Sequence, residues 1–222
     1  MNIYQLLRIG EHHINHCEDY AIVETIGQGK ILCAVMDGCT MGGDSYFAAT
    51  LVGKLLRKIA IEKSYQSFYD KSHNTSVDID LKYILGKLMA ELKDLKNKLL
   101  LKDDELLTTL LIAIMDVENN TGKILTIGDG LVCINGQLYE FEQDNKPDYL
   151  GYHLAEEFEM WYSKQKQILH IDKIEDISIC TDGIFTFSAY DKKKYNVQKD
   201  PINYLQLIIY WLTKKIKSLK AC

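Results

Sequence analysis

Apolar residues recur at helical spacing in three parts of the chain. The first part begins at Asp44, and the second lies in the middle of the chain. The first stripe consists of Phe47, Leu51, Leu55 and Ile59, and the second of Leu81, Ile84, Leu85, Leu88, Leu92, Leu95 and Leu99. The third part begins at Pro201, a residue suited to the first turn of a helix, and reaches about Lys220. We therefore expect three helices, with Asp78 or Asp80 capping the second.

Short apolar runs bounded by turn residues predict β-strands. A run at 107–116 is apolar almost without interruption, as expected for a strand covered on both faces. Asn135-Gly136 is the strongest short hairpin signal in the chain, and residues 27–30 form a second plausible turn. The polar stretch 63–80 predicts a surface loop. The expected strands are 4–9, 20–26, 31–36, 107–116, 123–127, 131–134, 137–141, 168–171 and 176–181.

The order of these elements indicates the fold class. Strands come first, followed by two helices, many strands and a last helix, so the chain does not alternate strand and helix. This order disfavours a doubly wound parallel sheet. The pattern favours an α+β protein in which helices pack outside antiparallel sheets.

Length and composition indicate the number of domains and the cellular compartment. The 222 residues, 47% of them apolar, fit a single domain spanning 1–222. A net charge of −5 gives no nucleic-acid footprint, and no apolar run is long enough to span a membrane. The first residues lack the basic and apolar segments of a secretory signal. The six cysteines form no CxxC pair, so we expect reduced thiols in a cytoplasmic protein and no thiolate metal site.

Carboxylates at strand ends carry the candidate chemistry. Two predicted strands run directly into an Asp-Gly pair, at Asp37 and at Asp182. Either pair alone is more simply interpreted as a turn, but two of them could bring carboxylates to one point. Glu18 with Asp19, and Asp129 between two strands, are further candidates, with solvated turns as the alternative. Mg²⁺ and Mn²⁺ prefer such oxygen ligands.

Six segments, in this order along residues 8–187, resemble motifs of the metal-dependent protein phosphatases (PPM, type 2C). The third segment differs from the family pattern because Leu107 replaces a glycine. The segments are 15–19 (Asn-His-Cys-Glu-Asp), 35–43 (Val-Met-Asp-Gly-Cys-Thr-Met-Gly-Gly), 107–110 (Leu-Thr-Thr-Leu), 127–130 (Ile-Gly-Asp-Gly), 143–147 (Gln-Asp-Asn-Lys-Pro) and 179–184 (Ile-Cys-Thr-Asp-Gly-Ile).

The resemblance implies a four-layer fold, a β-sandwich with helices on both outer faces, and a site for two Mg²⁺ or Mn²⁺ ions. In that site Asp37 would bridge both ions, and Glu18 and the Gly38 carbonyl would complete one of them. Asp19 would support this ion from outside its ligand shell, and Asp182 would bind the other ion. Glu18, Asp37 and Asp182 would thus be the catalytic carboxylates.

A third, weaker metal is also known in the family, and Asp129 is its candidate ligand. The family often places another Asp four residues after the late Asp-Gly motif, where this chain has Thr186. The family also ends on a strand preceded by an Asp that binds the same ion as Asp182. After Asp182 only Asp191 and Asp200 follow, and neither precedes an apolar strand. The Asp182 side of the site therefore lacks expected carboxylates.

The family's phosphate-binding arginine is also missing, because Ile14 stands four residues before Glu18. His13 and His16 lie close by in the sequence and could donate to phosphate, although exposed loop histidines are an equal alternative.

Two functions remain open from the sequence. The first is a serine/threonine protein phosphatase in which hydroxide shared by two metal ions attacks phosphoserine or phosphothreonine of a protein substrate. The second is a phosphatase-like binding module with weak or no catalysis, which the missing arginine and missing aspartate favour. The retained motif carboxylates favour the enzyme.

Overall fold

The computed structural model describes residues 2–9, 16–69, 75–143 and 147–186. The helix that the sequence predicts after Pro201 lies outside these residues, as do His13, Ile14, Asp191 and Asp200. None of the described helices is long and apolar enough to cross a membrane.

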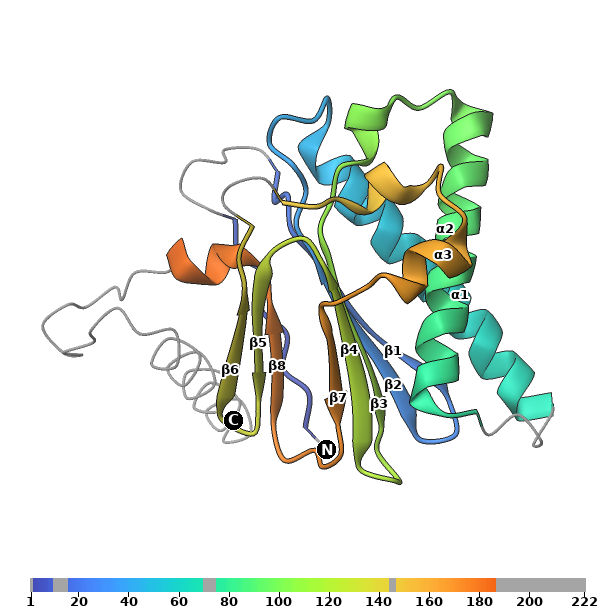
Figure 1. Cartoon of the computed structure of the whole chain (residues 1–222), viewed down its shortest axis with the longest axis vertical. Helices are drawn as coiled ribbons and strands as arrows, with labels where there is room; N and C mark the ends of the chain where they lie inside the picture. Colours follow the sequence, from blue (N-terminus) through green and yellow to red (C-terminus); the bar gives the residue numbers. More distant parts are fainter. Residues whose placement is uncertain (1, 10–15, 70–74, 144–146, 187–222) are drawn as a thin grey trace, which may run out of the picture.

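Two antiparallel sheets form the centre of the molecule (Figure 1). The larger sheet has the strand order β1-β2-β3-β4-β7, and the smaller has the order β6-β5-β8. The strands of the larger sheet are β1 (Tyr20–Gly27), β2 (Lys30–Met36), β3 (Leu110–Asp116), β4 (Thr121–Ile127) and β7 (Ile168–Ile171). Those of the smaller sheet are β5 (Gly130–Ile134), β6 (Gln137–Phe141) and β8 (Ile177–Cys180).

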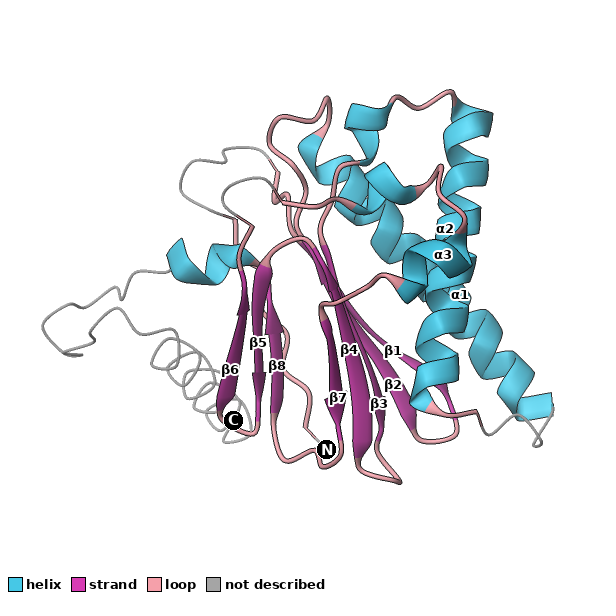
Figure 2. Cartoon of the chain, in the orientation of Figure 1, coloured by secondary structure: helices cyan, strands magenta, loops and turns pink. Residues whose placement is uncertain are grey.

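The helices α1 (Ser45–Tyr69) and α2 (Val77–Leu99) pack on one face of the larger sheet, and the smaller sheet packs on its other face (Figure 2). The larger sheet therefore has an apolar core on each face, and alternate residues of β3 point into one core or the other. Ile112 faces the helices, whereas Leu111 and Ala113 face the smaller sheet. All seven residues of β3 are buried, as the apolar run predicts. The short elements are η1 (Asp103–Leu106), η2 (Leu150–His153), α3 (Phe158–Ser163) and η3 (Asp182–Thr186).

The predicted α+β class with antiparallel sheets is confirmed, and so are both hairpins. Asn135 and Gly136, at φ 51° and 82°, close the turn between β5 and β6. Gln28 and Gly29, at φ 40° and 70°, close the turn between β1 and β2. Positive φ at both central positions is the geometry that matches the twist of paired strands.

Two predicted elements are wrong. Residues 4–9 form no strand, because they make no backbone ladder, and their apolar side chains are largely exposed. The predicted loop at 63–80 is mostly helix, since α1 continues to Tyr69 and α2 begins at Val77. Two of its polar residues, Lys63 and Asp80, are largely buried and paired with each other, so polarity here does not mark a loop.

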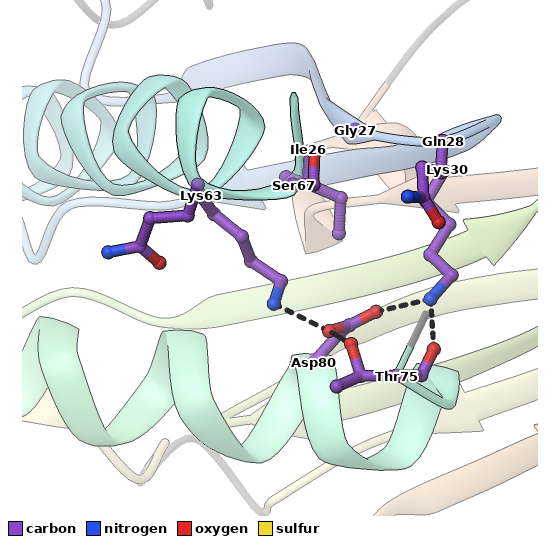
Figure 3. A pocket seen from close by; sticks show the side chains of 9 residues that line it. Ile26, Gly27, Gln28, Lys30, Lys63, Ser67, Thr75 and Asp80 are labelled. Atoms are coloured by element: carbon purple, nitrogen blue, oxygen red, sulfur yellow. Dashed lines mark hydrogen bonds and ion pairs between the residues drawn. The ribbon is translucent and has the colours of Figure 1, made fainter. Parts of the chain in front are cut away.

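The predicted caps of α2 are also wrong. Ser76 is the N-cap, and its hydroxyl accepts a hydrogen bond from the Ile79 amide at 3.4 Å. Asp80 instead points toward two lysines, Lys30 at the start of β2 and Lys63 on α1, at 2.8 and 2.7 Å (Figure 3). The Thr75 hydroxyl also donates to Asp80. This Asp80 cluster ties the first hairpin to both helices at one end of the larger sheet.

Candidate active site

Asp37 directly follows β2, and two threonines fix its backbone. The Thr109 amide donates to the Asp37 carbonyl at 2.9 Å, and the Asp37 amide donates to the Thr109 hydroxyl at 3.1 Å. The Thr108 hydroxyl donates to the same carbonyl at 2.8 Å. Both threonines are buried. The segment before β3 therefore holds the Asp37 peptide from two sides.

Glu18 lies beside Gly38 because their backbones pair. The Gly38 amide donates to the Glu18 carbonyl at 3.2 Å. A Cβ on Gly38 would lie 1.8 Å from the carbonyl oxygen of Ser45 and 3.1 Å from that of Glu18. Only glycine fits between these two segments, so the Asp-Gly pair serves close packing as well as chemistry.

Hydroxyl groups orient the Glu18 carboxylate. The Thr40 hydroxyl donates to one of its oxygens at 2.9 Å, and the Ser45 hydroxyl donates to the other at 2.5 Å. Ser45 is the first residue of α1. The glycine-rich turn after Asp37 and the start of this helix thus determine the direction of the Glu18 side chain.

Asp182 and Asp129 come from the smaller sheet. Asp182 begins η3 shortly after β8, and Asp129 directly precedes β5. The two strands are neighbours, with Leu131 opposite Cys180. The candidate site therefore takes Glu18 and Asp37 from the first strands of the larger sheet and Asp129 and Asp182 from the smaller sheet.

The candidate carboxylates affect one another's pKa. Burial, followed by the charges of Asp19 and Asp182, raises the pKa of Asp37 to about 9. Burial also raises the pKa of Asp19, and a hydrogen bond from the Thr181 side chain opposes this rise. Asp182 and Glu18 raise the pKa of Asp19 further. Like charges brought together at a half-buried point favour protonation unless a cation compensates them.

Asp129 lies at the margin of this group. Burial and the charge of Asp182 raise its pKa, and Asp129 in turn acts on Asp37. Asp129 therefore lies in the negative potential of Asp37 and Asp182, as expected for a candidate ligand of the weaker third metal.

The donor set fits hard divalent cations, because the expected ligands are carboxylate and carbonyl oxygens. Within the part of the chain that the structure describes, no three His, Cys, Asp or Glu side chains are arranged as a ready metal site.

The two candidate histidines differ in what can be said of them. His13 lies outside the described residues. His16 is exposed, and its ring lies against that of Tyr46 on α1, with the ring centroids 4.3 Å apart. This contact keeps His16 at the start of α1, near Ser45 and the Glu18 carboxylate.

Comparison with known protein families shows to which family the chain belongs. The family model described as "Protein phosphatase 2C" matches residues 9–217, which is nearly the whole chain. The chain belongs to the protein phosphatase 2C family. Its membership supports protein phosphatase activity in general and agrees with the motifs read from the sequence.

Solved phosphatase 2C structures confirm the fold. A variant of a bacterial serine phosphatase matches with a TM-score of 0.54 at 12% identity, covering 93% of this chain and 89% of its own. The PP2C phosphatase domain of SpoIIE from Bacillus subtilis, solved with a fragment of its regulatory domain, matches with a TM-score of 0.51 at 19% identity. That match covers 93% of this chain and 56% of its own. No curated protein matches the sequence significantly.

Sequence reasoning missed the residues that orient the phosphatase 2C carboxylates. Thr40, Ser45, Thr108, Thr109 and Thr181 hold the carboxylates or the backbone that carries them. A hydroxyl residue beside an acidic motif is a weak signal in a sequence, because such residues are common at turns and helix starts. Their partners are as many as 72 residues away along the chain and become visible only in the fold.

Proposed function

We propose that this phosphatase 2C member hydrolyses phosphoserine and phosphothreonine in proteins and depends on Mg²⁺ or Mn²⁺. The observation that carries the proposal is the placement of Asp37 directly after β2, where burial, followed by the charges of Asp19 and Asp182, raises its pKa to about 9. Carboxylates with raised pKa values cluster at functional sites, and oxygen donors are the ligands that Mg²⁺ and Mn²⁺ prefer.

Each carboxylate has a proposed role. Asp37 would be shared by two ions, and Glu18 and the Gly38 carbonyl would complete one of them. Asp182 would hold the second ion, and Asp129 a weaker third one. Asp19 would act through its neighbours rather than as a direct ligand. Divalent ions in such a site lower the pKa of bound water and neutralise charge on phosphoryl oxygens.

A second candidate function is a phosphoprotein-binding module with little turnover. It is favoured by Ile14 at the position of the family's arginine and by the missing late aspartate after Asp182. The retained Glu18, Asp37 and Asp182, with their supporting hydroxyls, favour the enzyme.

The test is turnover of p-nitrophenyl phosphate and of a phosphothreonine peptide by the full chain, in Mn²⁺ and in chelator. We expect metal-dependent turnover that Asp37→Asn and Asp182→Asn each reduce by at least about a hundredfold. Asp172→Asn is the matched control, because Asp172 is exposed and follows Ile171, which pairs with Gly122 at the opposite end of the sheet. Absence of turnover together with retained peptide binding would establish the binding module instead.

A further inference from the structure

Tyr149 lies at the candidate site through contacts of the residues on both sides of it. The Leu150 amide donates to the Thr108 carbonyl at 3.0 Å, and Thr108 itself binds the Asp37 peptide. On the other side, the Asp148 carbonyl packs on Gly128, where an added Cβ would lie 2.7 Å from it. Gly128 directly precedes Asp129. The segment 148–150 therefore joins the Asp37 and Asp129 parts of the site.

The Tyr149 side chain is directed toward the same region. It is half-buried beside the Cys39 thiol, and the charges of Asp129 and Asp37 both act on it. The ring of Tyr152 contacts that of Tyr149 edge to face, with the centroids 5.5 Å apart and the planes at 71°. This packing restricts the Tyr149 ring, whose hydroxyl lies beside the Cys39 side chain, two residues after Asp37.

Other hydroxyls at the site are already engaged. Thr40 and Ser45 donate to Glu18, Thr108 donates to the Asp37 carbonyl, and Thr181 bonds Asp19. Tyr149, by contrast, lies beside a thiol, and sulfur is a weak hydrogen-bond acceptor. Its hydrogen is therefore the one most readily transferred to a new acceptor.

A phosphoryl group entering this site needs hydrogen-bond donors as well as cations. The strongest charged neighbours of Asp37 and Asp19 are all carboxylates. Burial raises the pKa of Tyr149, so its hydroxyl keeps its proton at neutral pH and remains a donor.

We propose that the Tyr149 hydroxyl donates a hydrogen bond to a phosphoryl oxygen of the bound substrate. Resting on the proposed function, this inference adds a substrate-binding residue to the metal-binding carboxylates. A hydrogen bond to a charged oxygen is stronger than one between neutral groups, so its loss should be measurable as phosphate affinity.

The experiment measures orthophosphate binding to the Mn²⁺-loaded full chain by calorimetry, with Mn²⁺ affinity measured separately. Tyr149→Phe should weaken orthophosphate binding about tenfold, while Mn²⁺ affinity and melting temperature stay unchanged. Tyr152→Phe is the matched control, because it removes a hydroxyl from the contacting ring and should leave phosphate affinity unchanged.

Three results would overturn the inference. Equal phosphate affinity of Tyr149→Phe and wild type would show that Tyr149 donates no hydrogen bond to phosphate. A parallel loss of Mn²⁺ affinity would show that Tyr149 supports a carboxylate instead. Failure of the Mn²⁺-loaded wild type to bind orthophosphate would show that the protein has no phosphate-binding site here. Since binding is measured without turnover, wild type that binds orthophosphate through Tyr149 but hydrolyses nothing would refute only the proposed enzyme.

Discussion

The Thr108 hydroxyl donates a 2.8 Å hydrogen bond to the backbone carbonyl of Asp37. Thr108 is fully buried and lies just before β3, whereas Asp37 lies just after β2. The neighbouring strand thus holds the peptide of the proposed bridging carboxylate, and the position of that carboxylate depends on a residue with no charge of its own.

Thr108→Val should therefore reduce turnover more than its small change in volume suggests. We expect a loss of about 1–2 kcal/mol in the free energy of unfolding and about a tenfold loss in kcat. Thr126→Val is the matched control, since the hydroxyl of Thr126 is buried in β4 without a hydrogen-bond partner among the described residues. Urea denaturation and steady-state kinetics test both variants. Equal effects of the two substitutions would contradict the positioning role.

Asp37→Asn should change stability in opposite directions with and without metal. In chelator the variant should be more stable than wild type by about 1 kcal/mol, because it removes one of several repelling carboxylates. In millimolar Mn²⁺ it should be less stable than wild type, because it loses the stabilisation that ligand binding gives to the folded state. Melting curves in the two buffers measure this crossover. Asp172→Asn should show none, and a crossover there would point to a nonspecific salt effect.

Asp80→Asn should destabilise the protein by about 3–5 kcal/mol, because it leaves two largely buried lysines without their counter-charge. Lys30 and Lys63 have side chains that are 5% and 13% exposed, so water cannot fully replace the lost carboxylate. Glu91→Gln removes an ion pair to Lys58, whose side chain is 54% exposed, and should cost far less. Urea denaturation separates the two, and equal losses would show that burial does not decide the cost.

His153 should make stability depend on pH. Its ring contacts Asp148 at 2.8 Å and Glu156 at 2.6 Å, and these hydrogen bonds, the one to Asp148 above all, raise its pKa. The folded state therefore binds the proton more tightly than the unfolded state, whose pKa is about 6.5. The extra stability is fully present below that pH and is lost as the pH rises through the raised pKa.

The matched variant is His153→Gln. Wild type should exceed it in free energy of unfolding at pH 5.5, and this advantage should shrink by pH 8.5. Glu156→Gln should reduce the pH dependence in part, since Asp148 remains. An advantage that stays constant across this range would mean that His153 stabilises the fold by packing on Trp161 rather than by charge.

Strands inside the sandwich could be predicted from the sequence because buried strands have a recognisable pattern of apolar residues. β3 is apolar throughout, and β2 alternates between the two cores. Residues 4–9 have a similar composition but form no strand. A strand exists only where a partner ladder exists, and here Gln5 reaches the neighbouring strand through its side chain, which donates to the Ala21 carbonyl.

The helix boundaries depended on partners that the sequence does not reveal. Asp78 and Asp80 both look like caps, but Asp80 faces Lys30 and Lys63, and Asp78 pairs with Lys123. Ser76 takes the cap because the two aspartates are engaged elsewhere.

The sequence names the candidate carboxylates of the site, because each follows or precedes a strand in a recognisable motif. The orienting groups could not be predicted, since Thr108 and Ser45 act on residues 71 and 27 positions away. Such pairings depend on how strands and helices pack, which no local pattern encodes.

The Asp80 cluster also bears on how the chain avoids misfolded pairings. Lys30 opens β2 on the face that meets the helices, opposite the face that carries Cys33 and Val35. A slip of β2 by one residue would turn the Lys30 ammonium into the apolar space between the sheets and leave Asp80 with Lys63 but without Lys30. The native alignment is then the one in which the Lys30 charge is paired. The cluster would therefore specify the register of the hairpin, because it destabilises competing alignments more than it stabilises the native one.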